Sequence, residues 1–66
     1  MLTSNVKKIM EKKGISLRVL MRISGVSKQT IERARENTII QCSLDTLQKI
    51  ANGLDCKVKD LFEEEG

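Results

Sequence analysis

Lys28, Gln29 and Arg33 form a short polar cluster near the middle of the sequence. Arg and Lys side chains can donate hydrogen bonds to the acceptor edge of guanine, and a Gln side chain can pair with adenine through two hydrogen bonds. Gln29 and Arg33 are four residues apart, so they would share one face of a helix, with Ile31 and Ala34 directed inward. The cluster could therefore contact base edges in double-stranded DNA if a helix presents it. The alternative is an ordinary polar helix face.

The charge of the chain is unevenly distributed along its length. Residues 1–37 contain nine basic and three acidic side chains, a net charge of +6, whereas residues 38–66 contain three basic and six acidic ones, a net charge of −3. A basic segment of this kind favours a polyanionic partner, with the acidic end kept away from it. A solvated surface with uneven charge is the alternative, and Lys7, Lys8, Lys12 and Lys13 are interpreted mainly in that way.

The length and the residue types that are missing exclude several classes of function. A chain of 66 residues forms at most one small domain, which we expect to span residues 1–66. The absence of His removes the usual general base and the commonest metal ligand, and two Cys cannot complete a four-ligand zinc site. No combination of nucleophile, base and orienting group is recognisable. We therefore expect no metal, no cofactor and no enzymatic activity.

Hydropathy and cysteine content indicate the compartment. No apolar run approaches the roughly 18 residues that a membrane span needs, and the first residues lack the pattern of a signal peptide. We expect a cytoplasmic protein without membrane association. Cys42 and Cys56 are then reduced thiols that act as small apolar residues, and a redox switch is the less favoured interpretation.

Helical spacing of apolar residues predicts an all-α chain. Ser16, Ser27 and Ser43 each stand between an apolar residue directly before them and another four positions later, the pattern of a capped helix start with a hydrophobic staple. Three helices should therefore begin near residues 17, 28 and 44. The first helix should begin around residues 3–5 and end before Gly14.

The later helix ends are marked less clearly. Asn37 is predicted to stop the third helix near Glu36 by adopting a left-handed conformation. Gly53 is either the stop signal of the fourth helix or a residue of its last turn. A short fifth helix is predicted to carry Val58, Leu61 and Phe62 toward the core, followed by a frayed acidic end over residues 63–66.

A very short connection separates the second and third helices. It consists of Ser24, Gly25 and Val26, in which Gly25 supplies the positive backbone angle of the turn and Val26 points inward. Residues 17–36 are therefore interpreted as a helix-turn-helix.

Four segments resemble the Cro and lambda-repressor-like family of DNA-binding domains, also called the Xre family. They are residues 6–16 (VKKIMEKKGIS), 25–33 (GVSKQTIER), 43–51 (SLDTLQKIA) and 58–62 (VKDLF), and together they extend over nearly the whole chain. The resemblance implies a compact five-helix lambda-repressor-like domain that binds the major groove of double-stranded DNA. Since no cleavage segment or second domain follows, the chain is similar to the minimal Cro-like members, which act as repressors and bind palindromic operators as homodimers.

The resemblance also implies roles for individual residues. Base contacts are expected from Lys28, Gln29 and Arg33. Additional or phosphate contacts are expected from Leu17, Arg18, Ser27, Thr30, Glu32, Ser43 and Leu44. A homodimer interface is expected at Asp55, Cys56, Lys57, Val58 and Phe62.

Three features depart from the family pattern, so the operator preference of a relative cannot be transferred. Leu17 replaces the usual Gln at the start of the second helix, and Met21 replaces a small residue, with Ala34 as a compensating small neighbour. The loop over residues 37–43 is about one residue longer than usual, with Cys42 where Pro is frequent.

Two other functions remain open from the sequence. Antitoxins and controller proteins of restriction-modification systems use the same fold and would also bind DNA. A protein-interaction module, such as an anti-repressor, would instead use the apolar surface of the second helix, where Val19 and Ile23 form a contact patch unless they pack beneath the first helix.

Overall fold

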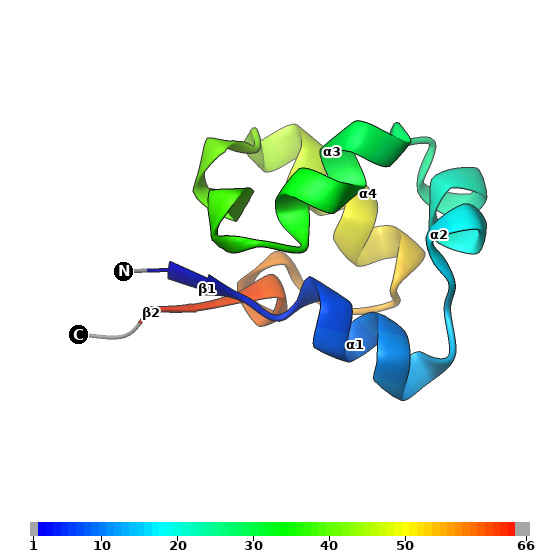
Figure 1. Ribbon diagram of the computed structural model, residues 1–66, viewed down its shortest axis with the longest axis horizontal. Helices are drawn as coiled ribbons and strands as arrows, with labels where there is room; N and C mark the ends of the chain where they lie inside the picture. Colours follow the sequence, from blue (N-terminus) through cyan, green and yellow to red (C-terminus); the bar gives the residue numbers. More distant parts are fainter. Residues whose placement is uncertain (1, 65–66) are drawn as a thin grey trace.

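The computed structural model describes residues 2–64, and these residues form a mostly helical fold with one small sheet. The elements are β1 (Leu2–Ser4), α1 (Val6–Lys13), α2 (Leu17–Ser24), α3 (Lys28–Ala34), the 3-10 helix η1 (Asn37–Gln41), α4 (Leu44–Gly53), the 3-10 helix η2 (Val58–Leu61) and β2 (Phe62–Glu64). Figure 1 shows the two strands at one end of the molecule and α2 at the other.

The three predicted serine caps are confirmed. The hydroxyl oxygens of Ser16, Ser27 and Ser43 each accept a hydrogen bond from the backbone N–H three residues later, at N···O distances of 3.3, 3.4 and 3.2 Å. Each bond satisfies one of the N–H groups that the first turn of a helix leaves without a partner. Because these caps depend only on neighbouring residues, α2, α3 and α4 begin where the sequence predicted.

The end of α1 also agrees with the sequence. Gly14 has a φ of +68°, and its N–H and that of Ile15 donate to carbonyl oxygens of the last turn of α1. This left-handed cap is open to glycine at little cost, and Lys12 and Lys13 lie in the favourable last turn of the helix.

The prediction of an all-α fold with five helices was wrong at both ends of the chain. Residues expected near the start of the first helix form β1, which pairs antiparallel with β2 in the register Leu2 with Glu64, Thr3 with Glu63 and Ser4 with Phe62. The predicted fifth helix is only the single turn η2, because Phe62 is extended, with φ −151° and ψ 159°, and enters the ladder instead. Residues 65 and 66 of the predicted frayed end lie outside the described residues.

The end of α3 follows a different mechanism from the predicted one. The helix ends at Ala34, and Arg35 follows with a right-handed φ of −77°, while Asn37 begins η1. The exposed carbonyl oxygen of Arg33 accepts a hydrogen bond of 2.7 Å from the hydroxyl of Thr38, and the hydroxyl of Ser4 donates to the carbonyl oxygen of Ala34. Side chains from β1 and η1 therefore replace the left-handed residue.

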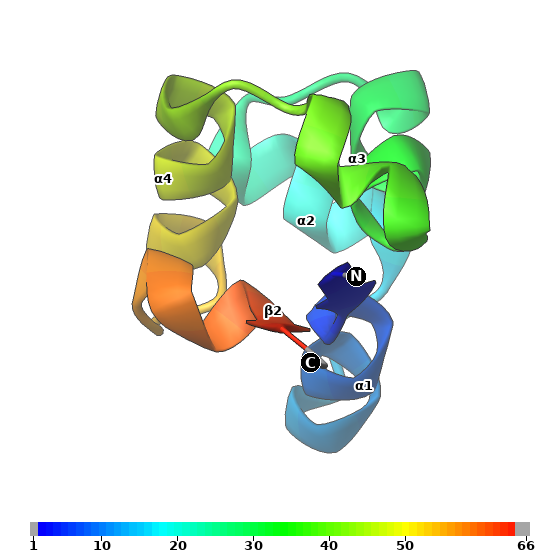
Figure 2. The same cartoon turned by 90° about the vertical axis from the view of Figure 1, so that its left-hand side faces the viewer.

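One core joins all the helices. Figure 2 shows α4 and η2 on one side of the molecule and α3 and α1 on the other. The buried side chains are Val6, Met10, Leu20, Val26, Ile31, Ala34, Ile39, Leu47, Ile50, Ala51, Leu54 and Leu61. Both helices of the predicted helix-turn-helix contribute to this core, so their relative orientation is set by packing as well as by the turn between them.

Candidate nucleic-acid interface

The turn between α2 and α3 is held by hydrogen bonds on both sides of Gly25. The N–H of Gly25, whose φ is +72°, donates to the carbonyl oxygen of Met21 at 3.0 Å. The hydroxyl of Ser24 donates to the carbonyl oxygen of Leu20 at 2.6 Å and accepts from the N–H of Val26 at 3.2 Å. Val26 itself is buried, as predicted. The connection is therefore a rigid turn that fixes α3 relative to α2.

The two faces of α3 are clearly separated. Ile31 and Ala34 are completely buried, whereas Lys28, Gln29 and Arg33 are exposed. The structure thus brings the three predicted base-contacting residues to the outer surface of one short helix. Whether they contact DNA is still a prediction, but the residues meet the geometric condition for it because no other part of the described fold covers them.

The remaining predicted residues of α3 have local partners. The N-cap hydroxyl of Ser27 lies 2.8 Å from the hydroxyl of Thr30, so the two oxygens share a hydrogen bond at the start of the helix. Glu32 is exposed, and its carboxylate lies 4.0 Å from the amino group of Lys28. An exposed pair of this kind contributes little stability, about 0–1 kcal/mol, so Lys28 can leave Glu32 for another acceptor at small cost.

The starts of α2 and α4 carry the predicted phosphate-contacting residues. Arg18 is exposed in the first turn of α2 and Leu17 is half-buried, while Leu44 is highly exposed at the first position of α4. The first-turn N–H groups of a helix favour anions because they lack helical partners. The first turn of α4 contains the carboxylate of Asp45, which lies 3.4 Å from the amino group of Lys49. The first turn of α2 contains Arg18 and no acidic residue, so the start of α2 has the more positive surroundings.

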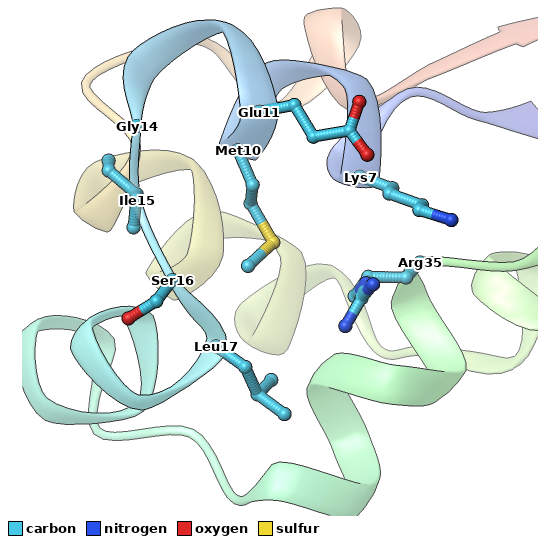
Figure 3. A pocket seen from close by; sticks show the side chains of 8 residues that line it. All are labelled: Lys7, Met10, Glu11, Gly14, Ile15, Ser16, Leu17 and Arg35. Carbon is cyan, nitrogen blue, oxygen red and sulfur yellow. The ribbon is translucent and has the colours of Figure 1, made fainter.

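A hollow lies between α1, the connection from α1 to α2 and the end of α3 (Figure 3). Ser16 and Leu17 line it on the α2 side, and Arg35 reaches into it from the α3 side. Sequence reasoning did not single out Arg35, because only the fold brings the end of α3 against α1. Lys7 also lines this hollow, whereas Lys8, Lys12 and Lys13 are exposed elsewhere on α1.

The residues of the predicted dimer interface lie together around the connection from α4 to η2. Asp55 has a φ of +54°, which an Asp tolerates better than most residues, and its carbonyl oxygen accepts a hydrogen bond from the amino group of Lys13 at 3.3 Å. Lys57 is exposed, and three further residues are half-buried against the core, namely Cys56, Val58 and Phe62. Assembly through this surface stays a prediction.

Several large apolar side chains are exposed. Val19 and Ile23 on α2 are 44% and 50% exposed, so they do not pack beneath α1. Ile40 in η1 and Leu44 in α4 are exposed by 69% and 72%, and sequence reasoning did not recognise this second pair as apolar surface. Adjacent apolar side chains on a surface favour a contact with another molecule, whereas isolated ones need no explanation.

Both cysteines are free and half-buried. Burial raises the pKa of the Cys42 thiol above the ordinary 9.0, and the positive charge of Arg33 offsets part of this effect. Burial is also the main reason for the raised pKa of Cys56. Within residues 2–64 no three His, Cys, Asp or Glu side chains are placed to hold a metal ion, and no helix is long and apolar enough to cross a membrane.

Comparison with known proteins agrees with this geometry. Residues 5–65 match the family model of the Cro/C1-type HTH (helix-turn-helix) DNA-binding domain. The chain is also similar to the SPbeta prophage-derived uncharacterized HTH-type transcriptional regulator YopS of Bacillus subtilis (strain 168), with 33% identity over 58 residues that cover 88% of this chain and 78% of that protein. The segment matched by the family includes α2, α3 and every residue predicted to contact DNA.

Proposed function

Because the chain belongs to the family of Cro/C1-type HTH DNA-binding domains, we propose that it is a sequence-specific transcriptional repressor that binds a palindromic operator as a homodimer. The observation that carries this proposal is the outer face of α3, where Lys28, Gln29 and Arg33 are exposed on a helix anchored by Ile31 and Ala34. A regulator of this kind acts in the cytoplasm by occupying DNA, without a cofactor and without catalysis.

In this proposal α3 enters the major groove. Arg33 and Lys28 donate to guanine, and Gln29 pairs with adenine. The first turns of α2 and α4 position the domain on the DNA backbone through their N–H groups, and phosphate contacts of this kind carry no sequence information. A palindromic operator presents two half-sites about 34 Å apart, which is why a second copy of the chain is required.

A test of base reading compares two classes of variant. Gln29→Ala and Arg33→Ala remove exposed side chains and should leave folding nearly intact. Each should cost roughly 1–3 kcal/mol at particular base pairs of the operator and much less on random duplex. The operator is first located by footprinting on DNA that flanks the gene, and binding is then measured on cognate, singly substituted and random duplexes.

The matched control for this test is Lys49→Ala, which removes an exposed basic side chain from α4. It should leave the difference between cognate and random DNA unchanged. If both α3 variants discriminate between sequences as well as the wild type does, base reading by Gln29 and Arg33 is refuted.

The exposure of Val19 and Ile23 favours one second candidate, a protein-interaction module that acts through α2. The two candidates differ in their response to salt. A DNA-binding domain releases counterions from several phosphates, so its affinity for duplex should decrease steeply as salt increases, whereas absent or salt-independent duplex binding would favour the interaction module.

A further inference from the structure

Two hollows flank the start of α2. We call the hollow of Figure 3 the α1-side hollow; its lining includes Met10, Glu11, Ser16, Leu17 and Arg35. The α3-side hollow is lined by Ser16, Leu17, Arg18, Met21 and Lys28. Because Ser16 and Leu17 line both, the two hollows are adjacent and form one band across the first turn of α2.

The charges along this band are not symmetric. The α3-side hollow is lined by the two cationic side chains Arg18 and Lys28 and by no acidic one, and the amino group of Lys28 lies 4.0 Å from the carboxylate of Glu32 outside it. The α1-side hollow contains Arg35 and Lys7 together with the single acidic residue Glu11. An anion is therefore favoured across the whole band, and most strongly in the α3-side hollow.

The positive band ends just beyond Arg35. The next hollow around α3 is lined by Lys7, Arg35, Glu32 and Glu36, so its cations and anions balance. A polyanion lying over the first turn of α2 would thus meet favourable charge as far as Arg35 and acidic residues after it. Arg35 and Lys7 are therefore the cations at the end of this path.

The position of Arg35 suits a phosphate contact. The residue is half-buried directly after α3, and Figure 3 shows its side chain pointing into the hollow that Met10 and Leu17 also line. No carboxylate of the described residues lies within 4.0 Å of its guanidinium group. The guanidinium, with five N–H donors, can therefore bind a phosphate through two hydrogen bonds.

We propose that Arg35 binds a phosphate of the DNA backbone on the α1 side of α2, so that the phosphate chain passes over Leu17 between Arg18 and Arg35. This inference rests on the proposed DNA-binding function and adds a residue that contacts the backbone only. Arg35 therefore contributes equally to binding of operator and of random DNA. The pair of guanidinium groups on either side of α2 limits how far the domain can shift along the backbone.

The test uses the salt dependence of duplex binding. Arg35→Gln removes the charge, and Arg35→Lys keeps the charge but loses the planar pair of donors. Lys59→Gln, at an exposed position of η2, is the matched control. Binding of a random-sequence duplex is measured by fluorescence anisotropy between about 50 and 200 mM salt. One lost phosphate contact lowers the slope of log affinity against log salt by about 0.9.

Arg35→Gln should show this smaller slope, so that over the fourfold salt range it loses roughly three- to fourfold less affinity than the wild type does. Its affinity at low salt should be reduced by the same factor on operator and random DNA. Arg35→Lys should keep the wild-type slope with weaker binding, and Lys59→Gln should match the wild type in both quantities. All measurements are made at a temperature where circular dichroism shows each variant to be folded.

The outcomes separate this inference from the proposed function. A wild-type chain that fails to bind duplex refutes DNA binding itself. A wild type that binds duplex, together with an Arg35→Gln variant that keeps both slope and affinity, overturns the role of Arg35 and leaves DNA binding intact. A further outcome would also overturn the proposal: inorganic phosphate stabilises the chain thermally through Arg35, but Arg35→Gln does not change duplex binding. The ligand of Arg35 would then be a free phosphate ion and not the DNA backbone.

Discussion

Replacement of Gly53 by Ala measures how closely α4 packs against α2. Gly53 lies in the last turn of α4 and does not have a positive φ, so its backbone conformation does not require glycine. In an open helix Gly→Ala would stabilise the fold by about 1 kcal/mol. A Cβ at Gly53, however, would lie 3.1 Å from Cδ1 of Leu20 and 3.3 Å from both Cγ1 of Ile23 and Cβ of Ser24.

Two of these three neighbours cannot easily move. Leu20 is completely buried, and Cβ of Ser24 is attached directly to the backbone of the turn that the Ser24 hydroxyl holds. Only Ile23, which is half exposed, can rotate away. Overpacking of this kind costs about 1–3 kcal/mol, and the gain in helix propensity offsets about 1 kcal/mol of it. We expect Gly53→Ala to lower the free energy of unfolding by about 1 kcal/mol, or the melting temperature by roughly 4–8 °C.

Thermal and urea unfolding followed by circular dichroism measures this change. Lys49→Ala, on the exposed face of the same helix, is the control and should change stability by less than about 0.5 kcal/mol. Gly14→Ala provides a second comparison, in which backbone strain acts without overpacking. A Cβ at Gly14 meets no atom within 4 Å, but the φ of +68° is strained for alanine. A Gly53→Ala variant that is as stable as the wild type or more stable would show that α2 yields to the added methyl group, and the packing argument would be refuted.

Three further predictions follow from the caps, the thiols and the expected assembly. Ser27→Ala should lower the free energy of unfolding by about 1 kcal/mol, because the N–H of Thr30 loses its acceptor; an unchanged urea midpoint would contradict this. Cys42 and Cys56 should react with iodoacetamide more slowly than a free thiol near neutral pH, because burial raises the pKa of both thiols. Any stability that the neutral thiols contribute should be lost only as pH rises above the ordinary pKa of 9.0. Rapid labelling of the folded chain would contradict this prediction. Sedimentation with operator DNA should give two chains per duplex, and Val58→Asp should weaken this assembly; one chain on an asymmetric site would refute the dimer.

Features that depend on neighbouring residues could be predicted from the sequence. Ser16, Ser27 and Ser43 cap helices through bonds to residues three positions away, and Gly25 makes its turn within three residues. The outward direction of Gln29 and Arg33 followed from helical periodicity alone.

Features that depend on distant residues could not be predicted in this way. Strands of three residues show no recognisable alternation, so the pairing of Thr3 with Glu63 left no signal in the pattern. Arg35 is distant in sequence from Met10 and Leu17, and only the folded arrangement of α1 and the end of α3 brings the three residues to one hollow. The sequence allows two interpretations of Gly53, and the approach of Leu20 identifies it as a residue of close packing.

The pairing of β1 with β2 closes almost the whole chain into a ring. Thr3 and Glu63 are about 60 residues apart, and closing a loop of that length costs roughly 3–4 kcal/mol of chain entropy. Two three-residue strands can offset this cost only after the helices have brought them together, so we expect the sheet to form last during folding and to open first in hydrogen exchange. Since Ser4 of β1 donates to the carbonyl oxygen of Ala34, each opening of the ring also releases the last turn of α3. Motion of β1 and β2 thus reaches α3, the helix that is proposed to read DNA.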